Sequence, residues 1–382
     1  MHVPFIDLKR FEPNFLEKWS EKVSFLSSKA SFMGGEEVEL LEQNLANLTE
    51  NKYSISCANG TDAMQLALRA LNIRNGDKVL LPNFTFWATF EAIVNVGAVP
   101  ITVDCEMCDG GMSLKYFIEA VDRYKPKAAI LAHLFGWSSR NLQKIRNCAN
   151  RNNVALLEDG AQCFGSKFNG EAIYKRALIS TTSFYPSKVL GAAGDGGAIF
   201  TNDKDLAFKV RQLANHGRGE HFAHVDVGWN SRLGSLQAAY LNITLAHFSD
   251  RIISRKKSLA IYKENLNYEI IKQISAPSQI DANGYCNVSY IEQYNFKRKL
   301  EEELFNNKIG FGNIYPATIS NQKGASNYLL SHVGGDEAHK ICSSVLNLPL
   351  FPYMTGPEIY WVIEIVEKTI QSYLENKKNL IE

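Results

Sequence analysis

Short apolar segments alternate with helical patterns through the first two-thirds of this chain. Between the apolar segments, residues 61–71 and 90–96 carry apolar side chains at helical spacing. Strands that are apolar at nearly every position and separated by helices predict a mostly parallel sheet covered on both faces. The fold class that we predict is therefore α/β. The buried strands are expected at residues 78–82, 99–104, 128–133, 154–158 and 197–201.

The pattern changes near residue 245. Residues 248–266 form a long, basic, amphipathic helical pattern, and weaker strand signals follow it. Two further helices are expected at residues 296–305 and 358–374. A chain of 382 residues exceeds one average domain. We therefore predict a large domain over residues 1–245 and a smaller α+β domain over residues 246–382.

Bulk composition excludes several classes of partner. A net charge of +1 gives no attraction to nucleic acid or to a membrane surface. No apolar run is long enough to span a bilayer, and the first residues lack the pattern of a secretory signal. Seven cysteines, an odd number without the spacing of a disulfide-rich domain, fit reduced thiols. We therefore expect a cytoplasmic protein that binds neither nucleic acid nor membrane.

No metal site is predicted either. Cys105 and Cys108 form a lone CxxC, which we interpret as a plain loop after a strand rather than a redox or metal site. The histidines at 216, 221 and 224 do not have the spacing of zinc ligands.

Lys188 stands between a hydroxyl-bearing turn at residues 183–187 and a glycine-rich stretch that ends at Gly197. Upstream, Asp159 closes an apolar strand pattern, where α/β sheets present ligand sites. Pyridoxal 5'-phosphate (PLP) chemistry needs a lysine that forms the Schiff base and an acid that keeps the pyridine nitrogen protonated. The alternatives are an ordinary surface lysine and a helix N-cap. The apolar and glycine-rich flanks favour the PLP site.

Other residues fit the same cofactor. Gly60 and Thr61 lie at the start of an apolar helix, whose free N–H groups suit a phosphate. The alternative is an ordinary Asn-Gly turn that caps the helix, which has the same sequence pattern. Phe86, with Trp87 as second candidate, lies at a strand-to-helix junction and can stack on a flat ring or pack in the core. Gln162 lies three residues after Asp159 and can reach the phenolic oxygen of the ring.

Polar side chains near the lysine and near the end of the large domain complete the candidates. Ser183 and Ser187 flank the lysine turn, and either hydroxyl can bind phosphate or cap the turn. Asn230 and Arg232 precede a helical pattern at 233–240 and suit an anion, a helix cap or a surface salt bridge.

The order of these motifs resembles one family, the DegT/DnrJ/EryC1/StrS sugar aminotransferases, which are PLP enzymes of fold type I. The resemblance runs from residues 4–8 to residues 348–352. It implies a seven-stranded, mostly parallel sheet in the large domain. By this resemblance Lys188 is the Schiff-base lysine, Asp159 pairs with the pyridine nitrogen, Gln162 lies near the 3'-oxygen and Phe86 stacks on the ring. Gly60, Thr61 and Ser183 form the phosphate cradle.

The same resemblance implies a homodimer with shared active sites. Asn230 matches a phosphate ligand that the neighbouring subunit donates. Arg232 matches a contact to the nucleotide sugar or to the carboxylate of the amino donor. Tyr315 and His224 are assigned to the substrate site.

The implied activity is transfer of an amino group from L-glutamate to a nucleotide-linked keto sugar in the biosynthesis of a bacterial surface polysaccharide such as lipopolysaccharide. Asp195 in the Gly-Asp-Gly-Gly loop is most similar to members that aminate C3 of UDP- or dTDP-linked 3-keto sugars, among them a UDP-linked hexuronic acid. Three alternatives stay open: amination at C4, a PLP-dependent sugar dehydratase, and a non-catalytic regulator. The chain departs from the family pattern with Gly160, Cys163 and Ile314 at positions where Ala, Ser and His are usual.

Overall fold

A computed structural model describes residues 1–220, 223–266 and 270–379 of the chain. Its α-helices are α1 (Phe15–Ser28), α2 (Glu36–Thr49), α3 (Gly60–Ala70), α4 (Trp87–Asn95), α5 (Leu114–Tyr124), α6 (Leu142–Arg151), α7 (Lys204–Ala214), α8 (Ser235–Ala246), α9 (Phe248–Asn265), α10 (Tyr294–Asn306), α11 (Glu337–Ser344) and α12 (Gly356–Asn379). Two 3-10 turns follow α10, at Ile319–Asn321 and Lys323–Ala325.

The strands form one large sheet and two small ones. They are β1 (Tyr53–Cys57), β2 (Lys78–Pro82), β3 (Val99–Val103), β4 (Ala128–Ala132), β5 (Ala155–Asp159), β6 (Lys167–Phe168), β7 (Glu171–Ala172), β8 (Ile179–Ser183), β9 (Gly197–Thr201), β10 (Lys272–Gln273), β11 (Ile280–Asp281), β12 (Asn287–Tyr290), β13 (Ser331–Val333) and β14 (Val345–Leu348). The small sheets have the orders β10-β12-β14 and β11-β6-β7.

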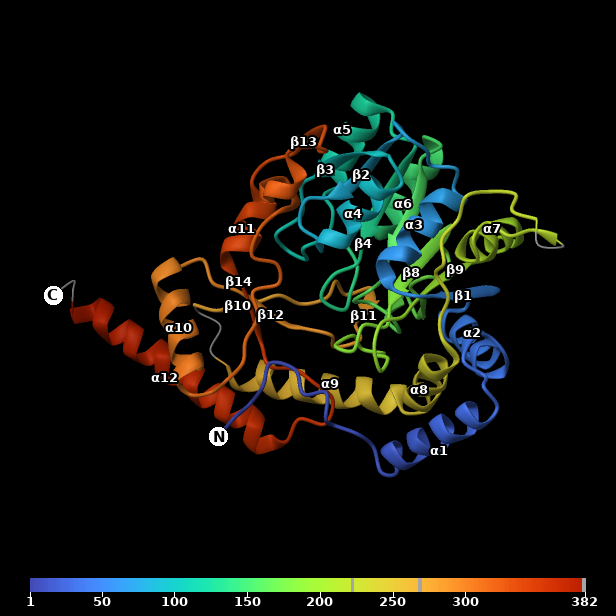
Figure 1. Ribbon diagram of the computed structural model, residues 1–382. Helices are drawn as coiled ribbons and strands as arrows, with labels where there is room; N and C mark the ends of the chain where they lie inside the picture. The colour runs from blue at the N-terminus through green and yellow to red at the C-terminus, as the bar shows by residue number, and fades with distance from the viewer. Residues whose placement is uncertain (221–222, 267–269, 380–382) are drawn as a thin grey trace.

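The large sheet has the order β1-β9-β8-β5-β4-β2-β3-β13 (Figure 1). Its strands pair in parallel except where β9 lies antiparallel between β1 and β8. The predicted α/β class is confirmed, and the five predicted strands correspond to β2, β3, β4, β5 and β9 within one residue at either end.

The sheet has eight strands rather than the seven expected, because β13 adds to its edge. Residues Ser331–Val333 pair in parallel with Ile101–Val103 of β3. A three-residue segment carrying Ser331 and His332 has too little apolar pattern to be read as a strand. β13 lies in the range that we assigned to the smaller domain, so the chain returns to the large sheet after leaving it.

Two apolar cores cover the two faces of the sheet. Side chains of α3, α4 and α7 pack on one face, and those of α2, α5, α6 and α8 pack on the other. Successive strand residues point to opposite faces. Leu80 therefore belongs to one core and Leu81 to the other, as do Leu131 and Ile130 of β4. Burial of both faces explains why these strands read as continuous apolar runs.

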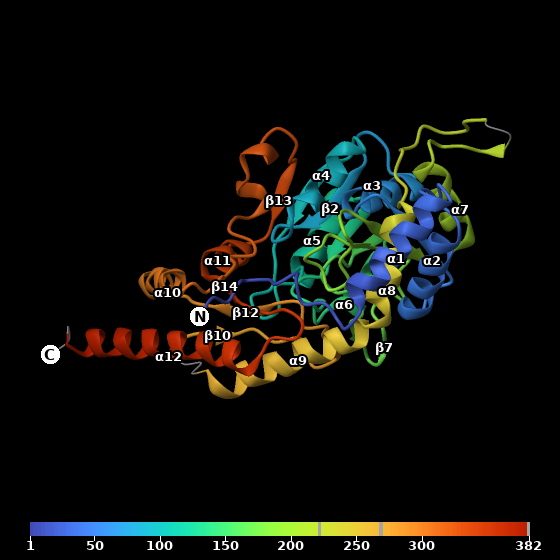
Figure 2. The same ribbon diagram turned by 60° about the horizontal axis from the view of Figure 1, so that its bottom comes forward.

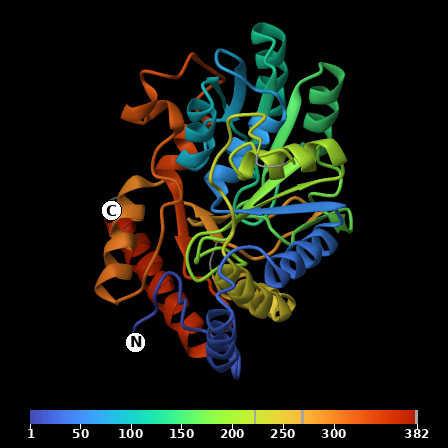
Figure 3. The ribbon, with the colours of Figure 1, turned by 45° about the vertical axis from the view of Figure 1, so that its right-hand side comes forward.

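A third core holds the C-terminal part together. It contains Tyr262 of α9, Phe296 of α10 and Val362 of α12. Val3 is buried in the same core and bridges to Ile309, so the first residues of the chain pack on this part. The N-terminal segment and helix α12 accordingly lie on the same side of the molecule (Figure 3). We retain the division near residue 245 as a proposal, in which the N-terminal segment and β13 cross between the two parts.

The cysteines are all unpaired. Cys105 is buried just after β3 and Cys108 is exposed in the following loop, as the sequence predicts for this CxxC. Among the described residues, no helix combines the length and the apolar character needed to cross a bilayer.

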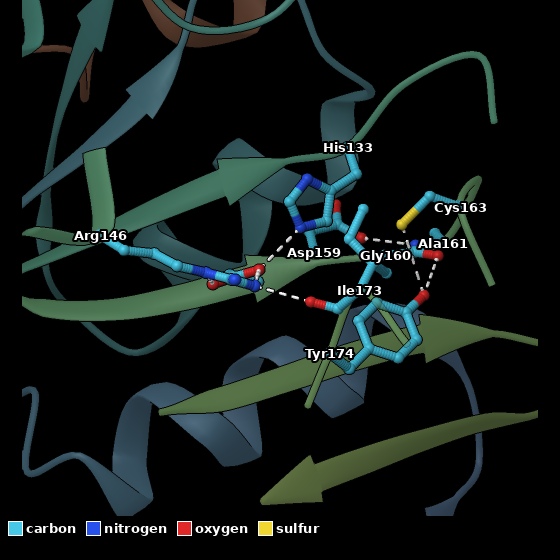
Figure 4. A network of polar contacts seen from close by, with 9 residues as sticks. His133, Arg146, Asp159, Gly160, Ala161, Cys163, Ile173 and Tyr174 are labelled. Atoms are coloured by element: carbon cyan, nitrogen blue, oxygen red, sulfur yellow. Dashed lines mark hydrogen bonds and ion pairs between the residues drawn. The ribbon is translucent and has the colours of Figure 1, made fainter. Parts of the chain in front are cut away.

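Gly160, directly after β5, makes room for a buried tyrosine. The Tyr174 hydroxyl donates a hydrogen bond of 2.8 Å to the Gly160 carbonyl oxygen, and the Cys163 thiol lies 3.6 Å from the same hydroxyl (Figure 4). A Cβ atom on residue 160 would lie 2.0 Å from the Tyr174 oxygen. The glycine at this position is therefore matched to the tyrosine.

We expect Gly160→Ala to lower the free energy of unfolding by about 2–3 kcal/mol, because an added methyl group forces a filled core apart. Gly356→Ala is the control, since a Cβ there meets nothing within 4 Å. Urea unfolding measures both changes. Equal stability of the two variants would contradict the matched packing.

Candidate active site

A cavity of about 670 Å³ opens at the carboxyl ends of the parallel strands. The segments that follow β1, β2, β4, β5 and β8 all reach it, which is the edge where α/β sheets present ligand sites. The cavity brings together most of the residues that the sequence predicts for the site. Its lining includes Gly60, Thr61, Phe86, Asp159, Gln162, Ser183, Lys188 and Tyr315.

Lys188 offers an amine to this cavity. Its backbone N–H closes a turn by donating to the Tyr185 carbonyl oxygen at 2.8 Å, and its side chain is half-buried. The ammonium lies 5.3 Å from the centre of the Tyr285 ring. Within the described part of the chain, Lys188 forms no ion pair with a carboxylate. The amine is therefore not committed to a structural salt bridge.

Asp159 lies at the end of β5 and is buried. One carboxylate oxygen accepts a hydrogen bond from the Ala161 N–H at 3.1 Å, and the other accepts one from the Thr89 hydroxyl at 3.2 Å. Thr89 is held in turn by the Thr85 hydroxyl at 3.0 Å. These bonds fix the carboxylate at the wall of the cavity and leave it lone pairs for another donor.

The start of α3 forms a cradle for an anion. Asn59 caps the helix by accepting a hydrogen bond from the Asp62 N–H at 2.8 Å. The N–H groups of Gly60 and Thr61 have no hydrogen-bond acceptor among the described residues. A Cβ on Gly60 would lie 2.7 Å from the Ser183 Cβ, so only glycine lets the helix approach β8 this closely. Free N–H groups at a positive helix end suit a phosphate.

Two aromatic rings and an amide form another wall. Phe86 is 55% exposed, so its ring is available to a flat ligand. Trp87, the second candidate, packs against Phe90 and does not line the cavity. The Gln162 side chain accepts from the Phe135 N–H at 2.6 Å and donates to the Tyr315 hydroxyl at 2.6 Å. Burial of this hydroxyl raises the pKa of Tyr315 well above its usual value.

This set of groups fits PLP. The cradle at Gly60 has the right donors for the phosphate, Phe86 presents an open ring face, and an acid and an unpaired amine share the cavity. A sequence profile of the DegT/DnrJ/EryC1/StrS aminotransferase family matches residues 17–367. The chain belongs to this family. PLP is therefore its cofactor.

Individual relatives agree with this assignment. The chain is 34% identical, over 94% of its length and 97% of the relative's, to the UDP-2-acetamido-2-deoxy-3-oxo-D-glucuronate aminotransferase of Pseudomonas aeruginosa. The crystal structure of DesV from S. venezuelae, in complex with a ketimine intermediate, superposes with a TM-score of 0.91 at 28% identity, covering 96% of this chain and 98% of that one. The crystal structure of NtdA from Bacillus subtilis, with bound cofactor PMP, superposes with a TM-score of 0.87 at 27% sequence identity. This match covers 97% of this chain and 85% of NtdA.

Next to this aminotransferase site the structure shows a buried ion-pair network, which the sequence did not reveal. Arg146 of α6 binds both oxygens of Glu158, at 2.7 and 2.8 Å, and donates to the Ile173 carbonyl oxygen (Figure 4). His133 Nε2 lies 2.9 Å from the same carboxylate. Burial alone would raise the pKa of Glu158, but Arg146 and His133 outweigh it and hold this pKa at about 2.

His133 connects this network to the cavity. It is 1% exposed, lines the cavity, and its Nδ1 is buried without a hydrogen-bond partner in the described chain. The ionised Glu158 accepts from Nε2–H, which fixes the position of one ring proton. Glu158 itself does not line the cavity, as expected for the strand neighbour of Asp159. In the sequence, the sign that His133 belongs to the site was its position at the end of a predicted strand, where α/β sheets present ligand sites.

The predicted residues Asn230, Arg232 and His224 lie outside this cavity. Asn230 and Arg232 are exposed, and Arg232 donates to Asn215 at 3.1 Å and to Asn230 at 2.6 Å. His224 is exposed and donates to the His216 carbonyl oxygen at 2.9 Å, while His221 lies outside the described residues. Residues 215–220 and 223–230 project from the body of the molecule (Figure 2).

Glu158→Gln should lower the free energy of unfolding by about 3 kcal/mol at neutral pH, because Arg146 would remain buried without a carboxylate. Since the pKa of Glu158 falls from 4.5 to about 2 on folding, its stabilisation is present above the unfolded value and is lost as the pH falls toward 2. The difference in the free energy of unfolding between wild type and Glu158→Gln should therefore decrease between pH 6 and pH 3, as measured by urea unfolding at steps of about one pH unit.

The control is Glu364→Gln on α12, whose exposed ion pair with Lys368 should contribute less than about 1 kcal/mol. If the difference in the free energy of unfolding between wild type and Glu158→Gln does not change with pH, the assignment of the low pKa to Glu158 is contradicted.

Gly60→Ala should weaken PLP binding about tenfold or more, because the added Cβ pushes α3 from Ser183 and misaligns N–H groups that bind a charged phosphate. Titration of the apoenzyme with PLP, followed by visible absorbance, measures the affinity. Gly335→Ala, where a Cβ makes only ordinary contacts, should bind PLP normally. Unchanged affinity in Gly60→Ala would remove this helix from the phosphate site.

Proposed function

We propose that this protein transfers an amino group from L-glutamate to C3 of a nucleotide-linked 3-keto sugar, as a step in making a bacterial surface polysaccharide. The observation that carries the proposal is the meeting of the unpaired Lys188 amine and the fixed Asp159 carboxylate in one cavity beside the Gly60 cradle. The Pseudomonas aeruginosa relative acts on a 3-oxo sugar bound to UDP, which supports the choice of C3 and of UDP.

Lys188 is assigned as the catalytic base and acid. When bound, PLP supplies an aldehyde that condenses with amines and a ring that accepts electrons. The released Lys188 amine takes a proton from the amino-bearing carbon of the donor, and it returns a proton to the corresponding carbon of the sugar in the second half of the reaction. The absence of a carboxylate partner for Lys188 among the described residues leaves the amine free for both transfers.

Asp159 is assigned to the protonated pyridine nitrogen. Its two hydrogen bonds, from Ala161 and Thr89, orient the carboxylate without neutralising it. A buried carboxylate held in this way favours a positive partner across the cavity. Gln162 and Tyr315, linked by a bond of 2.6 Å, are assigned to the phenolic oxygen and to the sugar.

The substrate site is proposed to be completed by a second copy of the chain. Asp62, Glu91, Asp159 and Asp195 line the cavity, and Lys188 is the single lysine or arginine there in the part of the chain that the structure describes. A nucleotide diphosphate is an anion and needs positive groups. Exposed Arg232, which does not line its own cavity, is proposed to supply such a group to the cavity of the partner in a homodimer. Asn230, exposed beside it, is proposed to bind the cofactor phosphate of the partner.

The compartment is a further part of the proposal. Seven unpaired cysteines fit the reducing cytoplasm, where activated nucleotide sugars are available to a polysaccharide pathway.

Lys188→Ala should lose at least about 1,000-fold in turnover, because the base is removed, and should also lose the visible absorbance of the lysine-bound cofactor. The wild type should be yellow and should bleach when L-glutamate alone is added. Stopped-flow absorbance separates the two half-reactions. Transamination by Lys188→Ala, or a wild type that does not respond to any amino acid, would overturn the aminotransferase assignment.

Substrate choice is tested with a panel of UDP-, dTDP- and GDP-linked 3-keto and 4-keto sugars. Each is added to the enzyme that glutamate has converted, and the return of the yellow colour is followed. A UDP-linked 3-keto sugar is expected to react fastest. Preference for a 4-keto sugar would change the proposed site of amination from C3 to C4 and would leave the roles of Lys188 and Asp159 unchanged.

Mixed dimers test the shared site. Lys188→Ala and the double variant Asn230→Ala, Arg232→Ala should each be nearly inactive alone. Random exchange of equal amounts gives about half mixed dimers, each with one intact site, and therefore about a quarter of wild-type activity. If both defects act within one subunit, each site of a mixed dimer keeps a single defect, and no activity returns.

A further inference from the structure

A second cavity, of about 260 Å³, lies against the Lys188 segment. It shares only Ser187 and Lys188 with the large cavity. Its other walls come from the N-terminal segment at residues 6–11, from the turn after Lys188 and from α9, which run close together in Figure 1. The site proposed above does not use it.

Three arginines line this second cavity, and two of them are neutralised. Arg10 pairs with Asp7 at 2.7 Å and also with Glu358. Arg251 binds both oxygens of Glu12, at 2.6 and 2.7 Å. Their charges are therefore balanced by the protein itself.

Arg255 differs from the other two. It is 4% exposed, and its one hydrogen bond to the described residues runs from Nη1 to the Leu350 carbonyl oxygen at 3.3 Å. Its Nε is buried without an acceptor, and no described carboxylate pairs with it. Burial lowers the pKa of Arg255 to about 10, which still leaves it charged at neutral pH. A buried, charged guanidinium with unused donors thus borders an open cavity.

We propose that this cavity binds a small carboxylate, which the Arg255 guanidinium holds beside the Lys188 segment. A buried cation without a counter-ion is costly, and an anion at hydrogen-bond distance offsets that cost. The planar guanidinium matches a carboxylate in shape and in donor spacing. The ligand is independent of the reaction proposed above.

The size and walls of the cavity favour a short carbon chain over a nucleotide. Its volume falls below the range of about 300–1,000 Å³ that drug-sized ligands occupy. Ile6, Leu8 and Val189 supply apolar surface beside the arginine. Ser187 and Lys188 form part of the wall. A carboxylate bound in the cavity would therefore stabilise the position of the turn that carries the lysine.

Calorimetric titration of the holoenzyme with glutarate and with acetate tests the proposal. These carboxylates have no amino or oxo group, so they do not react at the cofactor. Wild type should bind at least one of them. Arg255→Met should weaken binding about tenfold or more, the loss expected for hydrogen bonds to a charged group, and Arg255→Lys should weaken it less.

Lys257→Met is the matched control, because Lys257 is exposed on the same helix and the variant removes the same charge. It should bind like wild type. The melting temperature gives a second readout: carboxylate should raise it in wild type and in Lys257→Met, and not in Arg255→Met.

Three outcomes would overturn the site. They are a wild type that binds neither carboxylate, an Arg255→Met variant that is folded and binds as tightly as Lys257→Met, and a site that takes phosphate or sulfate while it refuses carboxylates. Arg255→Met should itself fold, because it replaces an unpaired buried charge by an apolar chain of similar length.

Discussion

Two consecutive carboxylates with opposite surroundings organise this enzyme. Glu158 turns into the interior, where Arg146 and His133 compensate its charge. Asp159, one residue later, turns to the cavity, and no cation of the described residues pairs with it. The alternation of side chains along β5 makes this division unavoidable. The buried pair fixes the strand end, and the strand end in turn orients the acid that we assign to the cofactor nitrogen.

Much of this arrangement was predictable because it follows from short-range patterns. Strands buried on both faces are continuous apolar runs, so β2 to β5 and β9 could be located from sequence. Ligand-binding side chains follow such strands, which led to Asp159 and to Phe86. By contrast, the partners of Glu158 come from α6 and the end of β4, and no local pattern indicates that they meet. The same holds for Tyr285 beneath Lys188, which a distant segment of the chain supplies.

The residues that we assign to the site fall in two places. Most of the groups assigned to the cofactor follow strands of the large sheet. Asn230, assigned to the cofactor phosphate of the partner, and Arg232, assigned to the substrate, are exposed and lie outside that sheet. Loops of this kind tolerate change more readily than the strands they connect. A family built in this way can keep one reaction while it changes the sugar.

The late strand β13 has a consequence for synthesis. Ribosomes deliver the chain from the N-terminus, and β3 has no neighbour on its outer side until residues 331–333 emerge. During that interval β3 is an open edge, the kind of surface that invites pairing with other nascent chains. Completion of the cofactor-binding half thus waits for nearly the last part of the message to be translated.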